Sequence, residues 1–189
     1  MKKLKIVIIG AGDGSNEILD LLTSNYKNFT IKKTTKNKIN FKLYDKFLIS
    51  LGDPQKRAKI FSSLSKYNSK LMKLIDKRAY VSTFSKIGKG TIIFPNTTIG
   101  YNVKIGRNCY IGANCSIGHD VLIGDHCVLA PGTLIGGSTK IGSKSFLSLG
   151  STITPYLKIG SNTKISAREV LYKDLPPNST FIGSRILKN

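Results

Sequence analysis

The chain has two histidines, His119 and His126, and only the first is followed by an acid, Asp120. An imidazole has an ordinary pKa of about 6.5, so it can accept a proton near neutral pH. A carboxylate bonded to one ring nitrogen fixes the tautomer, leaves the other nitrogen free and stabilises the imidazolium. The pair His119–Asp120 is therefore the first candidate for acid–base chemistry. The alternative is a solvated surface histidine beside an unrelated acid.

A six-residue repeat surrounds both histidines and must position them. The residue after each aliphatic position is most often Gly, and the residue two places before it is usually small or Val. His119 comes two places after Ile117, which predicts that it faces outward. Every sixth residue from 81 to 165 is aliphatic: Val81, Ile87, Ile93, Ile99, Ile105, Ile111, Ile117, Ile123, Leu129, Ile135, Ile141, Leu147, Ile153, Ile159 and Ile165.

This periodicity predicts a chain wound as a triangular prism, in which each hexad forms one flat side and one corner. The aliphatic residue points to the axis, a small residue fills the second inward position, and the Gly or small residue after the aliphatic permits the corner. Three hexads make one coil, so the repeat predicts five coils at roughly 4.8 Å each. Stacked coils pair their backbones and bury columns of side chains, so no coil is stable alone. Ordinary hairpins would instead show period two and breaks in register.

The three cysteines, Cys109, Cys115 and Cys127, all fall on the small inward position of the repeat. This predicts buried free thiols rather than metal ligands or a disulfide. A zinc hydratase on the same repeat would need three histidines per site. Because the whole chain has two, no metal site is expected.

The segment before the repeat reads as a small α/β unit. A buried-strand run, Leu4–Ile9, precedes a Gly-rich turn at residues 10–15 and a segment at helical spacing. Lys46–Leu51 is expected to be a second strand, Pro54–Tyr67 a helix, and Lys70–Ile75 a last short strand. This is half of a dinucleotide-binding unit and too small for a whole NAD site. The expected domains are residues 1–76, 77–167 for the repeat, and 168–189 as a C-terminal tail.

At this point the sequence resembles the hexapeptide-repeat acyltransferases. Their signature is present in Ile105-Gly106-Arg107-Asn108-Cys109 and Ile111-Gly112-Ala113-Asn114-Cys115, and Lys173–Ser179 resembles the segment with which these enzymes leave the helix. The resemblance implies an α/β N-terminal half-Rossmann domain followed by a left-handed parallel β-helix of about five coils. Its handedness comes from the family alone. The half-Rossmann unit joined to such a helix resembles the sialic-acid O-acetyltransferase and nucleotide-linked amino-sugar N-acetyltransferase branch, which serves surface glycan synthesis.

The resemblance also implies roles for particular residues. His119 would be the general base and Asp120 would polarise it, for transfer of an acetyl group from acetyl-CoA to an amine or hydroxyl of a sugar, probably one linked to a nucleotide. The pantetheine arm would lie between neighbouring prisms of a homotrimer and bond the amides of Gly137 and Ala167. Relatives commonly carry a second histidine where this chain has Val128, so the role of His126 stays open between substrate contact and plain surface.

For the sugar, the matching positions are Gly10, Ala11 and Gly12 in the first turn, and Gly52 and Arg57 in the second loop and the helix after it. Three positions depart from the family pattern. Gly14 replaces a histidine, residues 32–38 lack an acidic pair, and the ending reads Gly183-Ser184-Arg185-Ile186. A non-catalytic trimeric scaffold, or a protein that only binds a sugar nucleotide, is therefore the alternative reading.

The charge balance points to anionic partners. The chain has 189 residues with 30 basic and 10 acidic side chains, a net charge of +20. Genome-wide enrichment of lysine is one explanation, and a phosphorylated small molecule is another. No alternation of aromatic and basic residues suggests nucleic acid. The apolar run Ile6–Ile9 is too short for a membrane span or a signal peptide, which predicts a cytoplasmic location and no membrane insertion.

Overall fold

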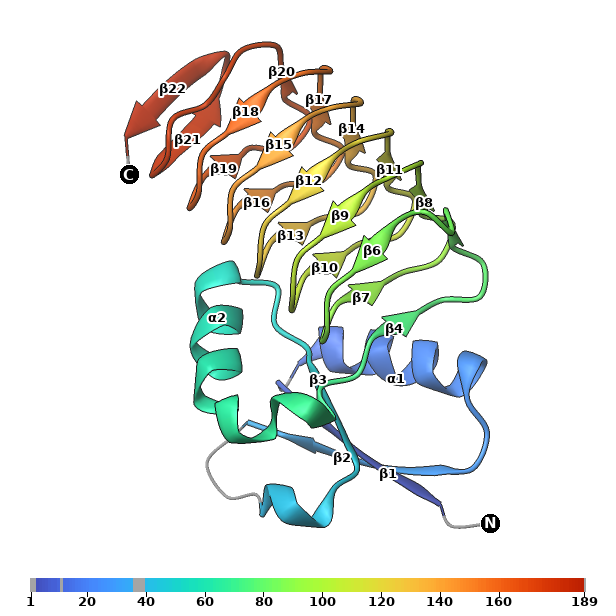
Figure 1. Ribbon diagram of the computed structural model, residues 1–189. Coiled ribbons are helices and arrows are strands. Elements are labelled where there is room, and N and C mark those ends of the chain that lie inside the picture. The colour runs from blue at the N-terminus through green and yellow to red at the C-terminus, as the bar shows by residue number, and fades with distance from the viewer. Residues whose placement is uncertain (1–2, 11, 36–39, 189) are drawn as a thin grey trace.

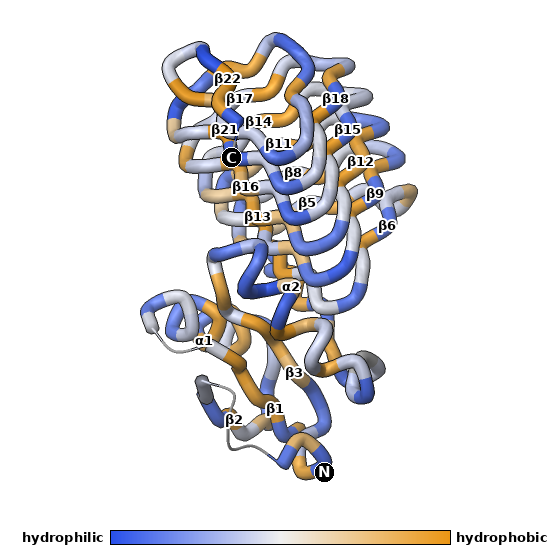
Figure 2. Tube along the Cα trace, turned by 90° about the vertical axis from the view of Figure 1, so that its left-hand side faces the viewer, coloured by the Kyte–Doolittle hydropathy of each residue, from blue (hydrophilic) through white to orange (hydrophobic). Residues whose placement is uncertain are grey.

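The computed structural model describes residues 3–10, 12–35 and 40–188. A small unit of strands and helices comes first, and a long parallel β-solenoid follows (Figure 1). Figure 2 shows the apolar residues concentrated in the strands of the first unit and repeated along the solenoid.

The first unit is a three-stranded parallel sheet with strand order β2-β1-β3. Both faces of the sheet are covered, so β1 is a continuous apolar run rather than an alternating one. Its elements are β1 (Leu4–Ile9), α1 (Asp13–Asn25), β2 (Phe29–Thr34), a 3-10 turn (Phe41–Leu43), β3 (Lys46–Ile49), α2 (Pro54–Ser63) and a second 3-10 segment (Ser65–Lys70).

The two faces of this sheet pack against different partners. Ile6 and Ile8 lie on the face covered by α1, in a cluster that also contains Ile92 of the solenoid. Val7 and Ile9 lie on the opposite face, which packs against Phe61 of α2. The first unit and the solenoid therefore share a core.

The solenoid consists of parallel two-residue strands in three sheets, which we name after their first strands; the last two strands of the chain have four residues each. The β4 sheet contains β4 (Leu74–Ile75), β7 (Ile92–Ile93), β10 (Tyr110–Ile111), β13 (Val128–Leu129), β16 (Phe146–Leu147), β19 (Lys164–Ile165), β21 (Ser179–Ile182) and the antiparallel β22 (Arg185–Lys188). The β5 sheet contains β5 (Tyr80–Val81), β8 (Thr98–Ile99), β11 (Ser116–Ile117), β14 (Leu134–Ile135), β17 (Thr152–Ile153) and β20 (Val170–Leu171). The β6 sheet contains β6 (Lys86–Ile87), β9 (Lys104–Ile105), β12 (Leu122–Ile123), β15 (Lys140–Ile141) and β18 (Lys158–Ile159).

The solenoid has about six turns, one more than the five expected from the repeat. The same register continues by one hexad at each end, to Ile75 and to the fully buried Leu171. Within the expected last short strand, Lys70–Ile75, Leu71 makes an isolated parallel bridge to Phe47 of β3, and Leu74–Ile75 pairs with β7 of the solenoid. The next position in this count is Pro177, which lacks an amide for the ladder. Leu175 instead forms the bridge to Ile159, and Phe181 of β21 pairs with Ile165.

The corners of the solenoid differ from the expectation in one respect. The glycine after each aliphatic residue is needed because a Cβ there would meet the backbone of the next coil; at Gly106 it would lie 2.6 Å from the carbonyl carbon of Gly124. The left-handed turn comes two residues later. Positive φ recurs there every six residues from Gly90 to Arg168, at Asn102 (54°), Asn108 (54°), Asp120 (57°) and His126 (63°) among others. Asn and Asp tolerate this conformation better than most residues.

Candidate active site

His119 and Asp120 form a hydrogen-bonded pair at a corner between β11 and β12. His119 Nδ1 lies 2.8 Å from Asp120 Oδ2. An ionised carboxylate only accepts hydrogen bonds, so the neutral ring carries its proton on Nδ1 and leaves the lone pair on Nε2. The side chains are 60% and 44% exposed, and Nε2 has no hydrogen-bond partner among the described residues. The pair has the geometry required of a general base.

Asn102 is a neighbour of this pair that the sequence reasoning missed. Its Nδ2 donates to Asp120 Oδ1 at 2.7 Å. This hydrogen bond, followed by the one to His119, keeps the pKa of Asp120 below its usual value. The spacing of 18 residues, one full coil, is the signal that could have found it.

Gly137 lies one coil above His119, against its ring. A Cβ built on Gly137 would lie 2.7 Å from His119 Nε2. Two backbone hydrogen bonds fix the peptide group that joins Gly137 to Ser138. The Gly137 carbonyl accepts a hydrogen bond from the Tyr156 amide, and the Ser138 amide donates one to the His119 carbonyl. Among the described residues, the Gly137 N–H itself has no hydrogen-bond acceptor. A free amide therefore lies beside the basic nitrogen.

Ala167 is exposed and lies at a different edge of the prism, between β19 and β20. Within one chain the structure therefore brings Gly137 to His119 but does not bring Ala167 to either of them.

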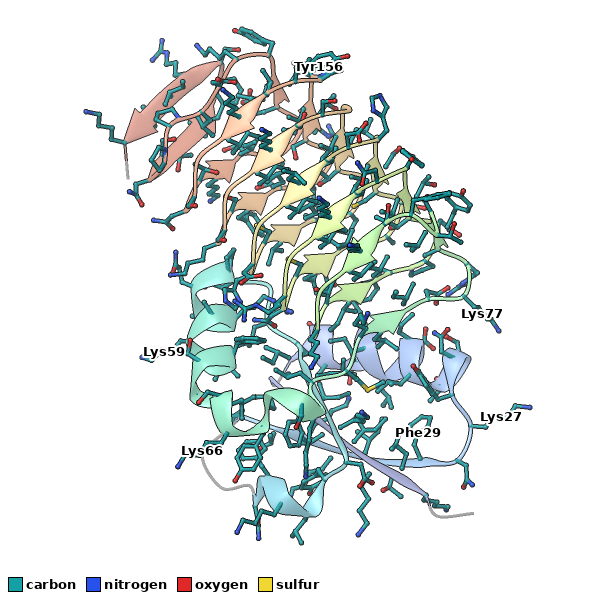
Figure 3. All side chains as sticks on the ribbon, viewed as in Figure 1. Lys27, Phe29, Lys59, Lys66, Lys77 and Tyr156 are labelled. Atoms are coloured by element: carbon teal, nitrogen blue, oxygen red, sulfur yellow. The ribbon has the colours of Figure 1, made fainter. Side chains whose placement is uncertain are left out.

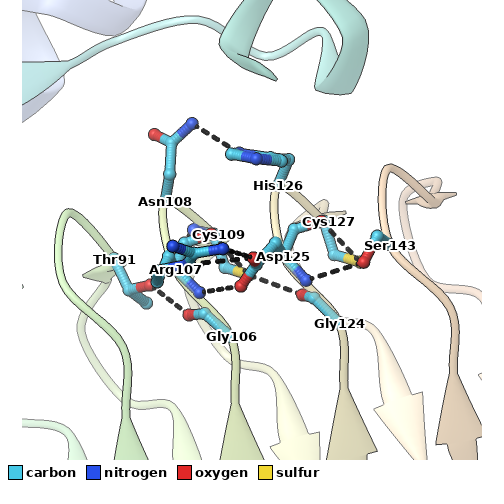
Figure 4. Close-up of polar contacts among 10 residues, drawn as sticks. All are labelled: Thr91, Gly106, Arg107, Asn108, Cys109, Gly124, Asp125, His126, Cys127 and Ser143. Carbon is cyan, nitrogen blue, oxygen red and sulfur yellow. Dashed lines mark hydrogen bonds and ion pairs between the residues drawn. The ribbon is translucent and has the colours of Figure 1, made fainter. Parts of the chain in front are cut away.

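His126 has a different environment, at a corner between β12 and β13 (Figure 4). Its Nδ1 lies 2.9 Å from Asn108 Nδ2, and its ring makes a T-shaped contact with the ring of Phe61, with centroids 5.0 Å apart. Since the amide nitrogen only donates, Nδ1 accepts, and the neutral ring carries its proton on Nε2. Burial lowers the pKa of His126, against the opposing effect of Asp125.

Arg57, which is expected at the sugar site, is a fully buried residue of α2 that faces the solenoid. Its Nε donates to the Asn108 carbonyl, Nη1 to the carbonyls of Ile49 and Leu51, and Nη2 to Asn108 Oδ1 and the Cys109 carbonyl. All five donors of the guanidinium therefore have protein partners, and none remains for a ligand. Burial lowers its pKa to about 10, so it remains charged at neutral pH.

The other residues expected at a sugar site follow the carboxyl ends of β1 and β3. Gly12 opens α1 and lines a cavity of about 510 Å³ with Asn16 and Lys33. Gly10 has a φ of 132° and lies against the carbonyl of Ser50. Gly52 lines a separate cavity of about 300 Å³. Ala11 lies outside the described residues.

No contact joins this region to the candidate base within the described part of the chain: His119 and Asp120 make no hydrogen bond, ion pair or ring contact with residues before 101. The cavity at Gly12 and the base at His119 are separate parts of one chain.

The described residues contain no cluster of three or more His, Cys, Asp or Glu side chains able to hold a metal ion. Cys109, Cys115 and Cys127 are buried and free, as the repeat predicts. None of the described helices is both long enough and apolar enough to cross a membrane.

Comparison with known families identifies the repeat. The family described as "Bacterial transferase hexapeptide (six repeats)" matches residues 84–119 and 102–137, the stretch that contains His119 and Gly137. This stretch of the chain is thus a hexapeptide-repeat solenoid. A search of curated proteins gives no match.

Solved structures extend the likeness to nearly the whole chain. GDP-perosamine N-acetyltransferase from Caulobacter crescentus, in complex with CoA and GDP-perosamine, is 22% identical, with a TM-score of 0.88 over 98% of this chain and 97% of that one. The acetyltransferase domain of PglB from Neisseria gonorrhoeae is 20% identical, with a TM-score of 0.87 over 98% and 99%. WeeI from Acinetobacter baumannii is 23% identical, with a TM-score of 0.87 over 98% and 100%. At these identities the likeness establishes the fold, including the first unit.

Proposed function

We propose that this protein is an acetyltransferase that moves an acetyl group from acetyl-CoA to an amine or hydroxyl of a nucleotide-linked sugar, in the synthesis of surface glycans. The observation that carries the proposal is the free Nε2 of His119, next to the unpaired amide of Gly137 and backed by Asp120. The similar solved structures, which include complexes with CoA and GDP-perosamine, support the donor and the acceptor class.

In the proposed reaction the acceptor nitrogen or oxygen attacks the thioester carbonyl while its proton passes to His119 Nε2. The Gly137 amide donates to the carbonyl oxygen as negative charge develops on it. The tetrahedral intermediate collapses, the C–S bond breaks, and Nε2 returns the proton to the departing CoA sulfur. Asp120 stabilises the imidazolium that exists between these two steps.

The proposed assembly is a homotrimer of left-handed prisms with the sites in the seams between chains. The edge that carries His119 exposes large aromatic side chains, among them Tyr156 (labelled in Figure 3), a composition suited to burial against another chain. These are Phe84, Tyr101, Tyr156 and Tyr172, with exposures of 65%, 56%, 75% and 57%. A neighbouring chain would supply Ala167 for the pantetheine arm.

The sugar nucleotide would bind at the first unit, a half-Rossmann domain in this proposal, spanning residues 1–76 ahead of the acyltransferase domain at 77–167 and the tail at 168–189. The cavity at Gly12 combines the amino end of α1, which favours negative charge, with the ammonium of Lys33. Gly10 and Gly52 shape the same end of the sheet. Since this cavity does not meet His119 of its own chain, the acceptor would reach a base on a neighbouring chain. The need for acetyl-CoA and a nucleotide sugar favours a cytoplasmic site of action.

The test is release of CoA thiol from acetyl-CoA with a panel of free and nucleotide-linked amino sugars, using the wild-type protein and His119→Ala. Acceptor-dependent release that requires His119 supports the proposal. Treating the product with mild base then separates an ester, which is cleaved, from an amide, which persists.

The competing function is a scaffold without catalysis. It would be favoured by an absence of thiol release with every acceptor together with an absence of acetyl-CoA binding in calorimetry. Binding of a nucleotide sugar alone would then identify a sugar-nucleotide-binding protein.

A further inference from the structure

We propose that Asn102 is the positioning residue of the candidate base: its amide holds the Asp120 carboxylate in the orientation that points Oδ2 at His119 Nδ1. The inference rests on the proposed function for its kinetic part, and on the hydrogen-bond chain alone for its structural part. Asn102 does not touch the ring and acts through Asp120.

The backbone around this chain of side chains is already fixed. Asn102 and Asp120 occupy corners one coil apart with φ of 54° and 57°. The Asp120 amide donates to the Tyr101 carbonyl at 2.8 Å, and the His119 carbonyl accepts the Ser138 amide at 2.8 Å. What remains free is the side-chain rotation of Asp120, which is 44% exposed. The hydrogen bond from Asn102 is the contact that restricts it.

Among the described residues, each carboxylate oxygen of Asp120 has one side-chain hydrogen-bond partner. Oδ1 accepts from Asn102 Nδ2 at 2.7 Å, and Oδ2 accepts from His119 Nδ1 at 2.8 Å. Because the carboxylate only accepts, the amide must present its nitrogen and the imidazole must carry its proton on Nδ1. If the carboxylate turned away, the ring would lose the partner that selects this tautomer, and the lone pair would no longer be confined to Nε2.

The bond is more than a consequence of the corner geometry. Asn96 and Asn114 occupy the same left-handed corner position, both with φ of 57°, and neither makes a side-chain hydrogen bond within the described part of the chain. Tolerance of positive φ explains an asparagine at all three positions. Only at Asn102 does the amide meet a carboxylate that is paired with a histidine.

The decisive variant is Asn102→Gly, because Gly keeps positive φ without strain and removes only the amide. Asn114→Gly is the matched control, since it makes the same backbone change where no side-chain bond is lost. We expect Asn102→Gly to lower kcat about tenfold, the scale of one hydrogen bond to a charged group, with KM for acetyl-CoA little changed. Asn114→Gly should leave both constants near the wild-type values. Equal kcat in the two variants would overturn the proposal.

Two readouts separate positioning from a general structural role. Asn102→Asp places a second negative charge near the imidazolium, so the acid limb of the kcat/KM profile should move to higher pH. Ring ¹⁵N NMR, which needs to distinguish only two histidines, should show that the Nδ1–H tautomer of His119 is less populated in Asn102→Gly than in Asn114→Gly. An unmoved acid limb or an unchanged tautomer population would count against the proposal.

The NMR measurement needs no substrate. If the wild-type protein proves to have no acetyltransferase activity, the proposed function fails, while the tautomer comparison still decides whether Asn102 positions the pair.

Discussion

Two edges of the same solenoid each carry a histidine at a corner, and only one of the two histidines is exposed. At the base edge, defined by Asn102, His119, Asp120 and Gly137, a corner asparagine donates to an acid one coil above. At the joint edge, defined by Arg57, Asn108, Asp125 and His126, a corner asparagine contacts a histidine one coil above. The spacing, the backbone conformation and the type of contact are the same.

The difference lies in what covers each edge. The base edge is exposed and its histidine carries the proton on Nδ1, with Nε2 free. The joint edge lies against α2, its histidine accepts through Nδ1, and Asn108 is itself bonded to the buried Arg57. A histidine in a repeat is therefore available for chemistry only where nothing from outside the repeat covers its corner.

The largest expected difference between the edges is in turnover. His119→Ala should lower kcat by about 10²–10⁴, the usual contribution of a general base, because no other described group can take the proton at that corner. His126→Ala should lower kcat less than about tenfold. Steady-state kinetics on the acceptor found in the thiol-release assay measures both, and circular dichroism checks that the fold is kept. The reverse order would mean that the wrong histidine has been assigned.

Stability should show the opposite pattern, with its maximum at the joint edge. Arg57→Ala leaves the carbonyls of Ile49, Leu51 and Asn108 without their buried donor, at an expected cost of about 3–5 kcal/mol in the free energy of unfolding. Arg185→Ala, on the exposed strand β22, is the control and should cost less than about 0.5 kcal/mol. Urea denaturation measures both. Equal midpoints would show that Arg57 does not hold the two units together.

Gly136 and Gly137 are adjacent, yet alanine at the two positions should affect different properties of the protein. In Gly137→Ala the new methyl would lie 2.7 Å from His119 Nε2, a movable side chain, so kcat should fall by about tenfold or more with little loss of stability. In Gly136→Ala the methyl would lie 2.5 Å from the Pro155 backbone nitrogen, so stability should fall first.

A double variant checks the cause of the loss in Gly137→Ala. Adding Gly137→Ala to His119→Ala should produce little further loss of kcat if the methyl acts by displacing the ring. A fully additive loss would point to the Gly137 amide rather than to the imidazole.

The smallest expected effect is a pH dependence at the joint edge. Burial lowers the folded-state pKa of His126, so the unfolded chain binds more protons between that pKa and about 6.5. Stability from this group is thus fully present above about pH 6.5 and declines as the pH falls through that window. Asp125 opposes the shift, and Arg57, Arg107 and Lys144 reinforce it. In thermal melts from pH 7.5 to 5, His126→Asn should show a shallower decline than the wild type; an equal slope would contradict this assignment.

The sequence predicts the solenoid because the repeat is visible within each hexad. One aliphatic residue in every six indicates which side chains face inward. It also predicts the His119–Asp120 pair, since the two are adjacent in the chain. The place of Arg57 could not be predicted in this way. A basic residue on an amphipathic helix is normally solvated, and only the contact of α2 with the Asn108 corner shows that this one is buried.

The contacts of Asn102 with Asp120 and of Gly137 with His119 were missed for a related reason. Period six identifies equivalent positions on successive faces, whereas contacts between coils join residues three hexads apart. Reading the sequence in columns of 18 would have paired Asn102 with Asp120 and Gly137 with His119. The hexad pattern of aliphatic residues does not predict where the backbone takes positive φ. The asparagines two places after the glycines are the sequence feature that indicates this position, because asparagine tolerates positive φ.

Because three hexads make one coil, the length of an insertion decides whether the candidate site stays intact. A six-residue insertion between Asp120 and Gly136 would keep every aliphatic residue facing inward and would leave the solenoid foldable, yet it would carry Gly137 round to the next edge, away from His119. An 18-residue insertion would restore the edge but move the amide one coil further along the axis, by about 4.8 Å. Hexads added above Gly137 or below Asn102 would leave the contacts among Asn102, Asp120, His119 and Gly137 unchanged, whereas the span between Asn102 and Gly137 is fixed in length.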